Sequence, residues 1–290
     1  MYAYALRGVV FIIYSIQMRL RRFSSEIHIH HSFGTSGVQH SEGSAQLFRF
    51  AFGLESFFCL PEEGMQQFEL LSRGSCFLTP SACGSRLRVV GPAHVSHPWQ
   101  FRARFAALAG PELDWLDALA ARPEAVRCTL SVRELRSGAL LAKIPLHDAC
   151  SLHPQLDLAV FDMCDETENI RRLEEEAGVS VLPVELADST AAIADRPVVL
   201  VGHELKDDET LLPCWLNGQV VGAEDNVVAV KTLGGVAQMG LCGGPALMQE
   251  KSDQVRAIGM VFARVDAEGP LFNHTLLVRA EAIKQFLQKS

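Results

Sequence analysis

The chain has 290 residues, of which 48% are hydrophobic and 21% are charged, a composition typical of a globular protein with a substantial core. Its formal net charge of −8 argues against a nucleic-acid-binding protein, and no stretch combines basic residues with interleaved aromatic residues. The composition therefore predicts no nucleic-acid partner.

The N-terminal segment carries arginines but no acidic residue before Glu26. The apolar run GVVFIIYSIQM between Arg7 and Arg19 is too short to span a bilayer, so we expect no stable membrane insertion. Arg21-Arg22-Phe23-Ser24 resembles the Arg-x-Phe-Ser pattern at which mitochondrial presequences are cut. We therefore expect residues 1–35 to be a mitochondrial transit peptide; the alternatives are a secretory signal and a disordered extension.

The eight cysteines include no CxxC pair, so their spacing predicts no structural zinc site. His28, His30 and His31 have no matching cysteine or carboxylate cluster, and we interpret them as part of a solvated tail rather than a metal site. A chain of this length needs no disulfide framework. We expect free thiols in an intracellular, reducing compartment, and neither a metal nor a cofactor.

Short apolar runs broken by turn-forming residues fill the region from 43 to 165, which predicts a first β-barrel there. The runs with strand length and strand composition are AQLFRFAF, GSCFLTPS, SRLRVVGPAHV, WQFRARFAAL, RCTLSVREL, LLAKIPL and LDLAVFDM. One exception, PELDWLDALAAR at 111–122, begins with proline and has the three- and four-residue apolar spacing of a helix.

A charged segment, DETENIRRLEEEAG at 165–178, predicts a solvated helix within a linker spanning 166–195. The strand pattern then resumes in RPVVLVGHEL, LPCWLNGQVVGA, NVVAVKTLG, AIGMVFARV and LFNHTLLV. Asn217-Gly218 is a hairpin-turn signal, and RAEAIKQFLQKS predicts a C-terminal helix with one apolar face. The region 196–290 is therefore expected to form a second β-barrel, in an all-β protein of two six-stranded antiparallel barrels.

The segment GLCGGP at 240–245 places a cysteine on a glycine-rich turn. It resembles the nucleophile turn of trypsin-like peptidases, with cysteine replacing serine as in the chymotrypsin-like cysteine proteases of picornaviruses. RVVGPAHV at 88–95 is similar to the segment that carries the catalytic base of this family, and LDLAVFDM at 156–163 is similar to the segment that carries the acid. The strand and helix after the turn resemble the HtrA protease domain, and we expect no PDZ domain after them.

This resemblance implies a chymotrypsin-type fold and a Cys-His-Asp triad that cleaves peptide or protein substrates. Cys242 is the implied nucleophile, because a thiol beside an imidazole forms a thiolate near neutral pH. His94 is the implied base, and Asp157 would hold its ring in the tautomer that can accept the thiol proton.

The resemblance also implies the surroundings of the nucleophile. The backbone N–H groups of Gly240 and Cys242 would form the oxyanion hole. Val236, Met260 and Val261 would line the pocket for the substrate side chain. None of these pocket residues can be charged, so we expect an apolar side chain in the pocket rather than lysine or arginine.

Several residues leave alternatives open. His97 competes for the role of base, and Asp148 and Asp162 compete for the role of acid. Leu241 stands where aspartate or asparagine is usual in the family, and Gly91-Pro92 replaces the usual pair before the base. The alternative function is therefore a catalytically inactive pseudoprotease that serves as a binding or scaffold protein.

Overall fold

The computed structural model is described here for most of the chain after the predicted targeting segment. The described residues are 48–81, 86–101, 114–134, 137–146, 150–163, 166–177, 184–187, 193–206, 210–233, 237–249, 254–265 and 271–289. Residues 1–35, and with them the transit-peptide prediction, lie outside these ranges.

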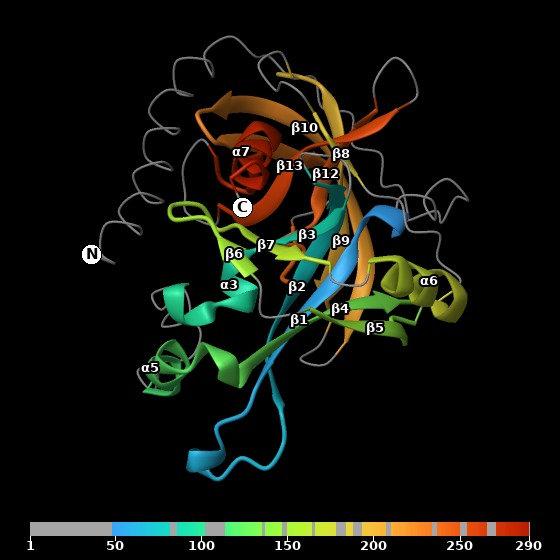
Figure 1. Ribbon diagram of the computed structural model, residues 1–290. Helices are drawn as coiled ribbons and strands as arrows, with labels where there is room; N and C mark the ends of the chain where they lie inside the picture. The colour runs from blue at the N-terminus through green and yellow to red at the C-terminus, as the bar shows by residue number, and fades with distance from the viewer. Residues whose placement is uncertain are drawn as a thin grey trace.

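The described chain is mostly β and contains two sheets (Figure 1). The first sheet has seven strands in the order β5-β4-β1-β2-β3-β7-β6, and all its pairings are antiparallel. Its strands are β1 (Phe52–Phe58), β2 (Glu69–Pro80), β3 (Leu87–Gly91), β4 (Val126–Arg133), β5 (Leu140–Leu146), β6 (Cys150–Leu152) and β7 (Ala159–Asp162). Within the described ranges β5 and β6 do not pair, so this sheet is open.

The second sheet closes on itself. Its order is β12-β9-β10-β11-β14-β13-β8, and the additional pairing of β12 with β13 completes a ring of six antiparallel strands. Its strands are β8 (Glu185–Leu186), β9 (Pro197–Leu205), β10 (Leu211–Glu224), β11 (Val227–Leu233), β12 (Pro245–Gln249), β13 (Val255–Arg264) and β14 (His274–Arg279). The two-residue strand β8 adds to β13 in parallel outside the ring. One closed six-stranded barrel is therefore present.

Few helices accompany the strands in the described residues, and three of them occur where the sequence predicts a helix. The α-helices are α3 (Ala93–Ser96), α5 (Asp114–Ala121), α6 (Glu166–Ala177) and α7 (Ala280–Leu287), and the 3-10 helices are η1 (Phe48–Phe50), η2 (Pro61–Glu63), η3 (Pro98–Phe101) and η4 (Pro123–Ala125). The expected helices at 111–122, at 165–178 and at the C-terminus are confirmed by α5, α6 and α7 over the residues that the structure describes. None of the described helices is long and apolar enough to cross a membrane.

The prediction of a hairpin turn at Asn217-Gly218 is wrong. Both residues lie inside the long strand β10, where Asn217 pairs with Leu233 and Gly218 with Val198. A Cβ on Gly218 would lie 2.6 Å from Cγ1 of Val230, so this glycine allows close packing between strands rather than a reversal of the chain. The connection between β10 and β11 instead passes through Asp225, whose φ is 43°.

Two other strand predictions also differ from the structure. The run at 45–52 becomes the 3-10 turn η1 followed by the start of β1, and the beginning of the run at 99–108 lies in η3. Both segments are apolar, and periodicity alone does not separate a short strand from a buried turn. The strands β6 and β12 were not expected, because three- and five-residue strands provide too little pattern.

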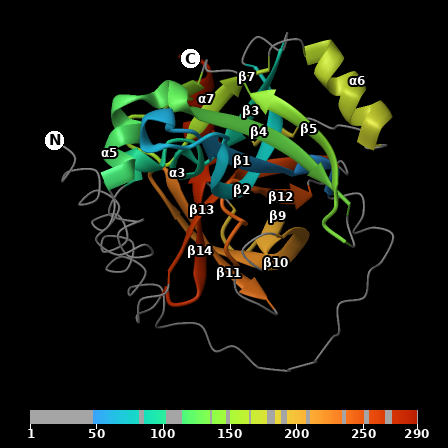
Figure 2. The same ribbon diagram turned by 90° about the horizontal axis from the view of Figure 1, so that it is seen from below.

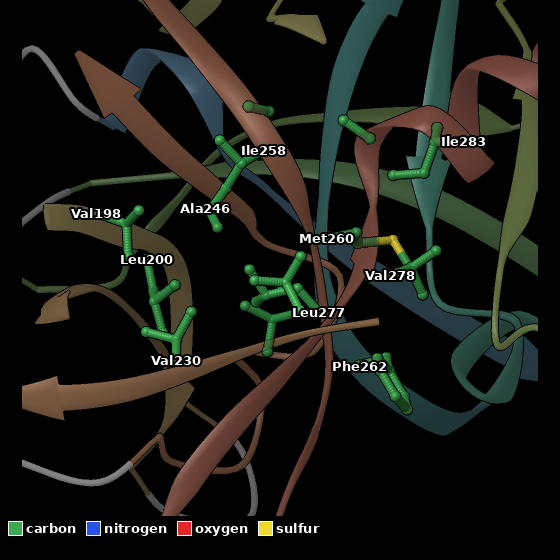
Figure 3. Packing of buried hydrophobic residues seen from close by; sticks show 14 of the residues in the cluster. Val198, Leu200, Val230, Ala246, Ile258, Met260, Phe262, Leu277, Val278 and Ile283 are labelled. Carbon is green, nitrogen blue, oxygen red and sulfur yellow. The ribbon is translucent and has the colours of Figure 1, made fainter. Parts of the chain in front are cut away.

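The barrel core is formed by β-branched and aliphatic side chains that alternate along its strands. Figure 3 shows Leu200 of β9, Val230 of β11 and Leu277 of β14 in the same interior space. Each of these three side chains is 0% exposed. Since every strand of the ring has a partner on both sides, inward-facing side chains are covered from all directions. The barrel therefore provides a rigid base for the loops that leave it.

The first sheet contains a buried ionic cluster centred on Glu55 of β1, which is 2% exposed. Its Oε1 lies 2.5 Å from Nη2 of Arg133 and 3.6 Å from Nε of Arg73, and its Oε2 lies 3.3 Å from Nζ of Lys143. The cations come from β2, β4 and β5, so one carboxylate joins four neighbouring strands. A buried charge of this kind is stable only while its partners remain.

Replacing Glu55 with glutamine should therefore destabilise the protein strongly. We expect Glu55→Gln to lower the free energy of unfolding by about 3 kcal/mol, because three cations would lose their shared counter-charge in a poorly solvated place. Asp162→Asn is the matched control: Asp162 is half exposed and pairs with Arg88 alone, so its loss should cost at most about 1 kcal/mol. Urea titration of both variants measures the difference, and equal costs would contradict the assignment.

Candidate functional site

Two neighbouring strands of the first sheet bring His94 and Asp157 together. Gly91 at the end of β3 pairs with Ala159 at the start of β7. His94 lies on α3, three residues after this pair along the chain, and Asp157 lies two residues before it. Both residues therefore lie next to the same end of this strand pair.

The Asp157 carboxylate contacts both the backbone and the ring of His94. Its Oδ1 accepts a hydrogen bond from the His94 backbone N–H at 2.9 Å, and its Oδ2 lies 2.6 Å from His94 Nδ1. The two residues are 7% and 8% exposed. A carboxylate accepts at this position, so we assign the ring proton to Nδ1, which leaves Nε2 with a lone pair. The ring is thereby oriented as a base.

The competing residues have other surroundings. His97 Nδ1 lies 2.8 Å from Ser96 Oγ, and burial lowers the pKa of His97 to about 4. Asp162 pairs with Arg88 at 2.9 Å. Asp148 lies outside the described residues. Of the described alternatives, neither forms an Asp–His pair like that of Asp157 with His94.

Cys242 lies on the turn between β11 and β12, and two glycines in left-handed conformations shape this turn. Gly240 has a φ of 95° and Gly243 a φ of 97°, values that strain any other residue. The Cys242 thiol is partly exposed, and its Sγ lies 3.4 Å from the Phe262 carbonyl oxygen. Leu241 is 0% exposed and belongs to the barrel core. The Leu241 side chain therefore anchors the turn in the barrel core.

The turn packs against the segment that leads to His94. A Cβ on Gly243 would lie 2.5 Å from Cδ of Pro92, and a Cβ on Gly74 of β2 would lie 2.9 Å from Cγ2 of Val95 and 3.0 Å from the Cys242 carbonyl oxygen. Such approaches are open only to glycine. The backbone around Cys242 therefore lies close to the residues on both sides of His94, Pro92 and Val95.

The expected oxyanion donors lie on this turn, and the expected pocket residues are only partly described. Among the described residues, the Gly240 N–H donates to no acceptor, so it remains available to a ligand or to water. Met260 is 0% and Val261 is 1% exposed, and both belong to the hydrophobic core around β13. Figure 3 shows Met260 beside Val278 of β14. Val236 lies outside the described residues.

Sequence reasoning missed two contacts of the turn. The Phe262 carbonyl oxygen accepts a hydrogen bond from the Cys242 thiol. Ser75 of β2 donates hydrogen bonds to the turn from its backbone N–H and from its hydroxyl group. Ser75 lies within the segment GSCFLTPS, which the sequence predicts to be a strand. No local pattern marks its role, because its partners lie in the other sheet.

The described part of the chain contains no cluster of three or more histidine, cysteine or acidic residues that could hold a metal ion. A scan against protein-family models gave no match to the chain, and a search of curated proteins gave no match either. The site must therefore be argued from its own geometry.

The thiol of Cys242 should be alkylated faster than the buried thiols. Burial raises the pKa of the Cys76, Cys150 and Cys214 thiols, so little reactive thiolate forms there. With limiting iodoacetamide at neutral pH, we expect Cys242 to react first. The predicted triad requires the His94 imidazole beside this thiol, where it would stabilise the thiolate, so His94→Gln is expected to slow the reaction by on the order of tenfold. Peptide mapping measures each rate, and a Cys242 as slow as the buried thiols would contradict the pairing.

A second buried histidine makes stability depend on pH. His203 of β9 is 2% exposed, and burial, with a smaller contribution from the Arg133 charge, lowers the pKa of His203 to about 3. The unfolded chain binds a proton at this ring below pH 6.5, whereas the folded chain does not until pH 3 is approached. The stability that neutral His203 contributes is therefore complete above pH 6.5 and is lost as the pH falls towards 3.

We expect the free energy of unfolding to fall by up to about 1.4 kcal/mol per pH unit from this residue alone as the pH drops from 6 to 4. His203→Leu should remove that share of the slope and leave a comparable share from His97, whose pKa is lowered to about 4. Urea titrations at pH 7, 6 and 5 measure both slopes. A variant with the same slope as the wild-type protein would refute the assignment to His203.

Proposed function

We propose that the protein is a trypsin-like endopeptidase with a Cys242–His94–Asp157 triad. The observation that carries the proposal is the double contact of the buried Asp157 carboxylate with His94, beside a glycine-bounded turn that presents a partly exposed thiol. A carboxylate that orients a histidine next to a nucleophile is the arrangement required for acyl transfer.

In the proposed reaction, His94 Nε2 takes the Cys242 thiol proton, and Sγ attacks the carbonyl carbon of the scissile peptide bond. The carbonyl oxygen becomes an oxyanion that receives hydrogen bonds from the backbone N–H groups of Gly240 and Cys242. Collapse of this intermediate breaks the C–N bond, and His94 returns the proton to the leaving amine. Water activated by His94 then hydrolyses the thioester, which releases the acid and restores the thiol.

The fold supports this proposal at a coarser level. A closed six-stranded antiparallel barrel, a second β-sheet and a C-terminal helix are compatible with the chymotrypsin type. His94 follows β3 and Asp157 precedes β7 of the first sheet, whereas Cys242 precedes β12 of the barrel, so the proposed triad would draw its residues from both β-units. Figure 2 shows these units on opposite sides of the molecule, with β1, β3 and β4 on one side and β11, β13 and β14 on the other.

For the substrate side chain we propose an apolar pocket next to the turn, over β13. Met260 and Val261 are buried beneath this surface and would support it rather than touch the substrate. Between 237 and 249 and between 254 and 265 the sequence contains no acidic residue. Arg264 Nη1 donates to the Ala237 carbonyl oxygen at 3.1 Å, which adds a positive charge beside the segment that leads to Cys242. A lysine or arginine of a substrate would therefore enter without a counter-charge, at a cost of several kcal/mol.

Cleavage of a mixed peptide library should occur after small or medium-sized apolar residues, since each buried methylene contributes about 0.8 kcal/mol. Cys242→Ala should abolish cleavage, and Asp157→Asn should lower kcat by about 10⁴-fold because the histidine tautomer is no longer fixed. Mass spectrometry of the products gives the preference. Dominant cleavage after lysine or arginine would disprove the pocket, whereas no cleavage together with a slow Cys242 thiol would favour the inactive binding protein.

A further inference from the structure

Ser75 of β2 bonds to both ends of the segment from Gly240 to Cys242. Its backbone N–H donates to the Cys242 carbonyl oxygen at 2.8 Å, and its hydroxyl group donates to the Gly240 carbonyl oxygen, also at 2.8 Å. The same Oγ accepts the backbone N–H of His203 at 2.9 Å. Ser75 is 0% exposed, so water cannot replace these bonds.

All four carbonyl groups from Met239 to Cys242 have a backbone or hydroxyl donor. Met239 O accepts from the Leu205 N–H at 2.7 Å, and Leu241 O accepts from the Gly244 N–H at 3.0 Å. Ser75 provides the donors for the other two carbonyls, through Oγ and N–H. Because a carbonyl and the following N–H share one rigid plane, fixing these carbonyls fixes every peptide of the turn.

The fixed planes determine where the N–H groups of the turn point. The Gly243 N–H, which shares a plane with the Cys242 carbonyl, donates to Val261 O at 2.7 Å. The Gly240 N–H has no acceptor among the described residues. At Gly240 the chain has the greatest conformational freedom, since glycine readily changes its φ and ψ. The Ser75 hydroxyl group donates its hydrogen bond to the carbonyl oxygen of Gly240.

We propose that Ser75 is a positioning residue for the oxyanion hole: it holds the peptide planes that follow Gly240 and Cys242 against β2. These two planes adjoin the planes that carry the Gly240 and Cys242 N–H groups, so holding them restrains rotation at both residues and keeps both N–H groups directed at the reacting carbonyl. The proposal rests on the proposed endopeptidase function. Ser75 itself touches neither substrate nor thiol proton. Without the Ser75 hydroxyl group, the Gly240 carbonyl oxygen loses its hydrogen-bond donor and the His203 backbone N–H loses its acceptor.

The crowding around Ser75 supports a role that only a small hydroxyl residue can fill. A Cβ on Gly202 would lie 2.7 Å from Ser75 Oγ, and a Cβ on Gly243 would lie 1.8 Å from the Ser75 carbonyl oxygen. Backbone from β9 and from the turn therefore approaches Ser75 on two sides. Alanine at position 75 would leave the Gly240 carbonyl and the His203 N–H without the hydroxyl partner. Cysteine at position 75 would fill the space of the serine side chain but form only weak hydrogen bonds.

The test compares Ser75→Ala and Ser75→Cys with the control Thr79→Val in the full-length protein. Thr79 lies on the same strand and is 1% exposed, and its hydroxyl group donates to the Val184 carbonyl oxygen at 2.8 Å, away from the turn. Two rates are measured for each variant: cleavage of a peptide substrate, with kcat and KM separated, and alkylation of Cys242 by iodoacetamide. Alkylation forms no oxyanion, so its rate measures the reactivity of the thiol independently of the oxyanion hole.

We expect both Ser75 variants to lower kcat by on the order of 10²-fold with little change in KM, because the donors act mainly on the transition state. Alkylation of Cys242 should be nearly unchanged, and Thr79→Val should leave both rates close to those of the wild-type protein. The cysteine variant fills the space of the serine, so it remains informative if the alanine variant does not fold. Peptide mapping distinguishes the introduced thiol from Cys242.

The other outcomes overturn the inference in different ways. If the wild-type protein cleaves peptides and a folded Ser75 variant retains its kcat, the positioning role is wrong and the endopeptidase function stands. If kcat and alkylation fall together, Ser75 acts on the thiol or on the fold rather than on the oxyanion donors. If the wild-type protein cleaves nothing and Cys242 is as slow as the buried thiols, the proposed function fails and the positioning role fails with it.

Discussion

The site depends on a tight backbone-to-backbone contact, in which β2 of the first sheet packs directly against the turn at Cys242. Gly74, Gly202 and Gly243 all lie at this junction, and a Cβ on any of them would be 3.0 Å or less from a neighbouring atom. Without side chains at these positions, main-chain groups of the two sheets bond to each other. The proposed site depends on this junction, because His94 follows β3 of the first sheet and Cys242 precedes β12 of the barrel.

The site residues that could be recognised from the sequence are those that lie in short, distinctive segments. GLCGGP, GPAHV and LDLAV each combine a reactive residue with a local backbone requirement, and the structure shows that His94 and Asp157 of two such segments are in contact. Ser75 gives no comparable signal. Its hydroxyl group acts on residues more than 100 positions away, so its importance depends on tertiary structure alone.

The same reasoning explains which parts of the fold were predicted. Helices α6 and α7 have patterns long enough to identify, as do the longer strands β4 and β9. The ring closure through β12 was not predictable, because a five-residue strand after a glycine turn resembles any short apolar run. Gly218 was misread for a physical reason: a glycine that permits close packing and a glycine that permits a turn look alike in the sequence.

The bond from the Ser75 hydroxyl group to the Gly240 carbonyl joins residues 165 positions apart, which has a consequence for folding in time. Closing a loop of this length has an entropic cost that slows folding. During synthesis β2 is made before the turn exists, and the first sheet alone cannot shape the turn. The bond that shapes the thiol turn can therefore form only when both β-units are present in the chain.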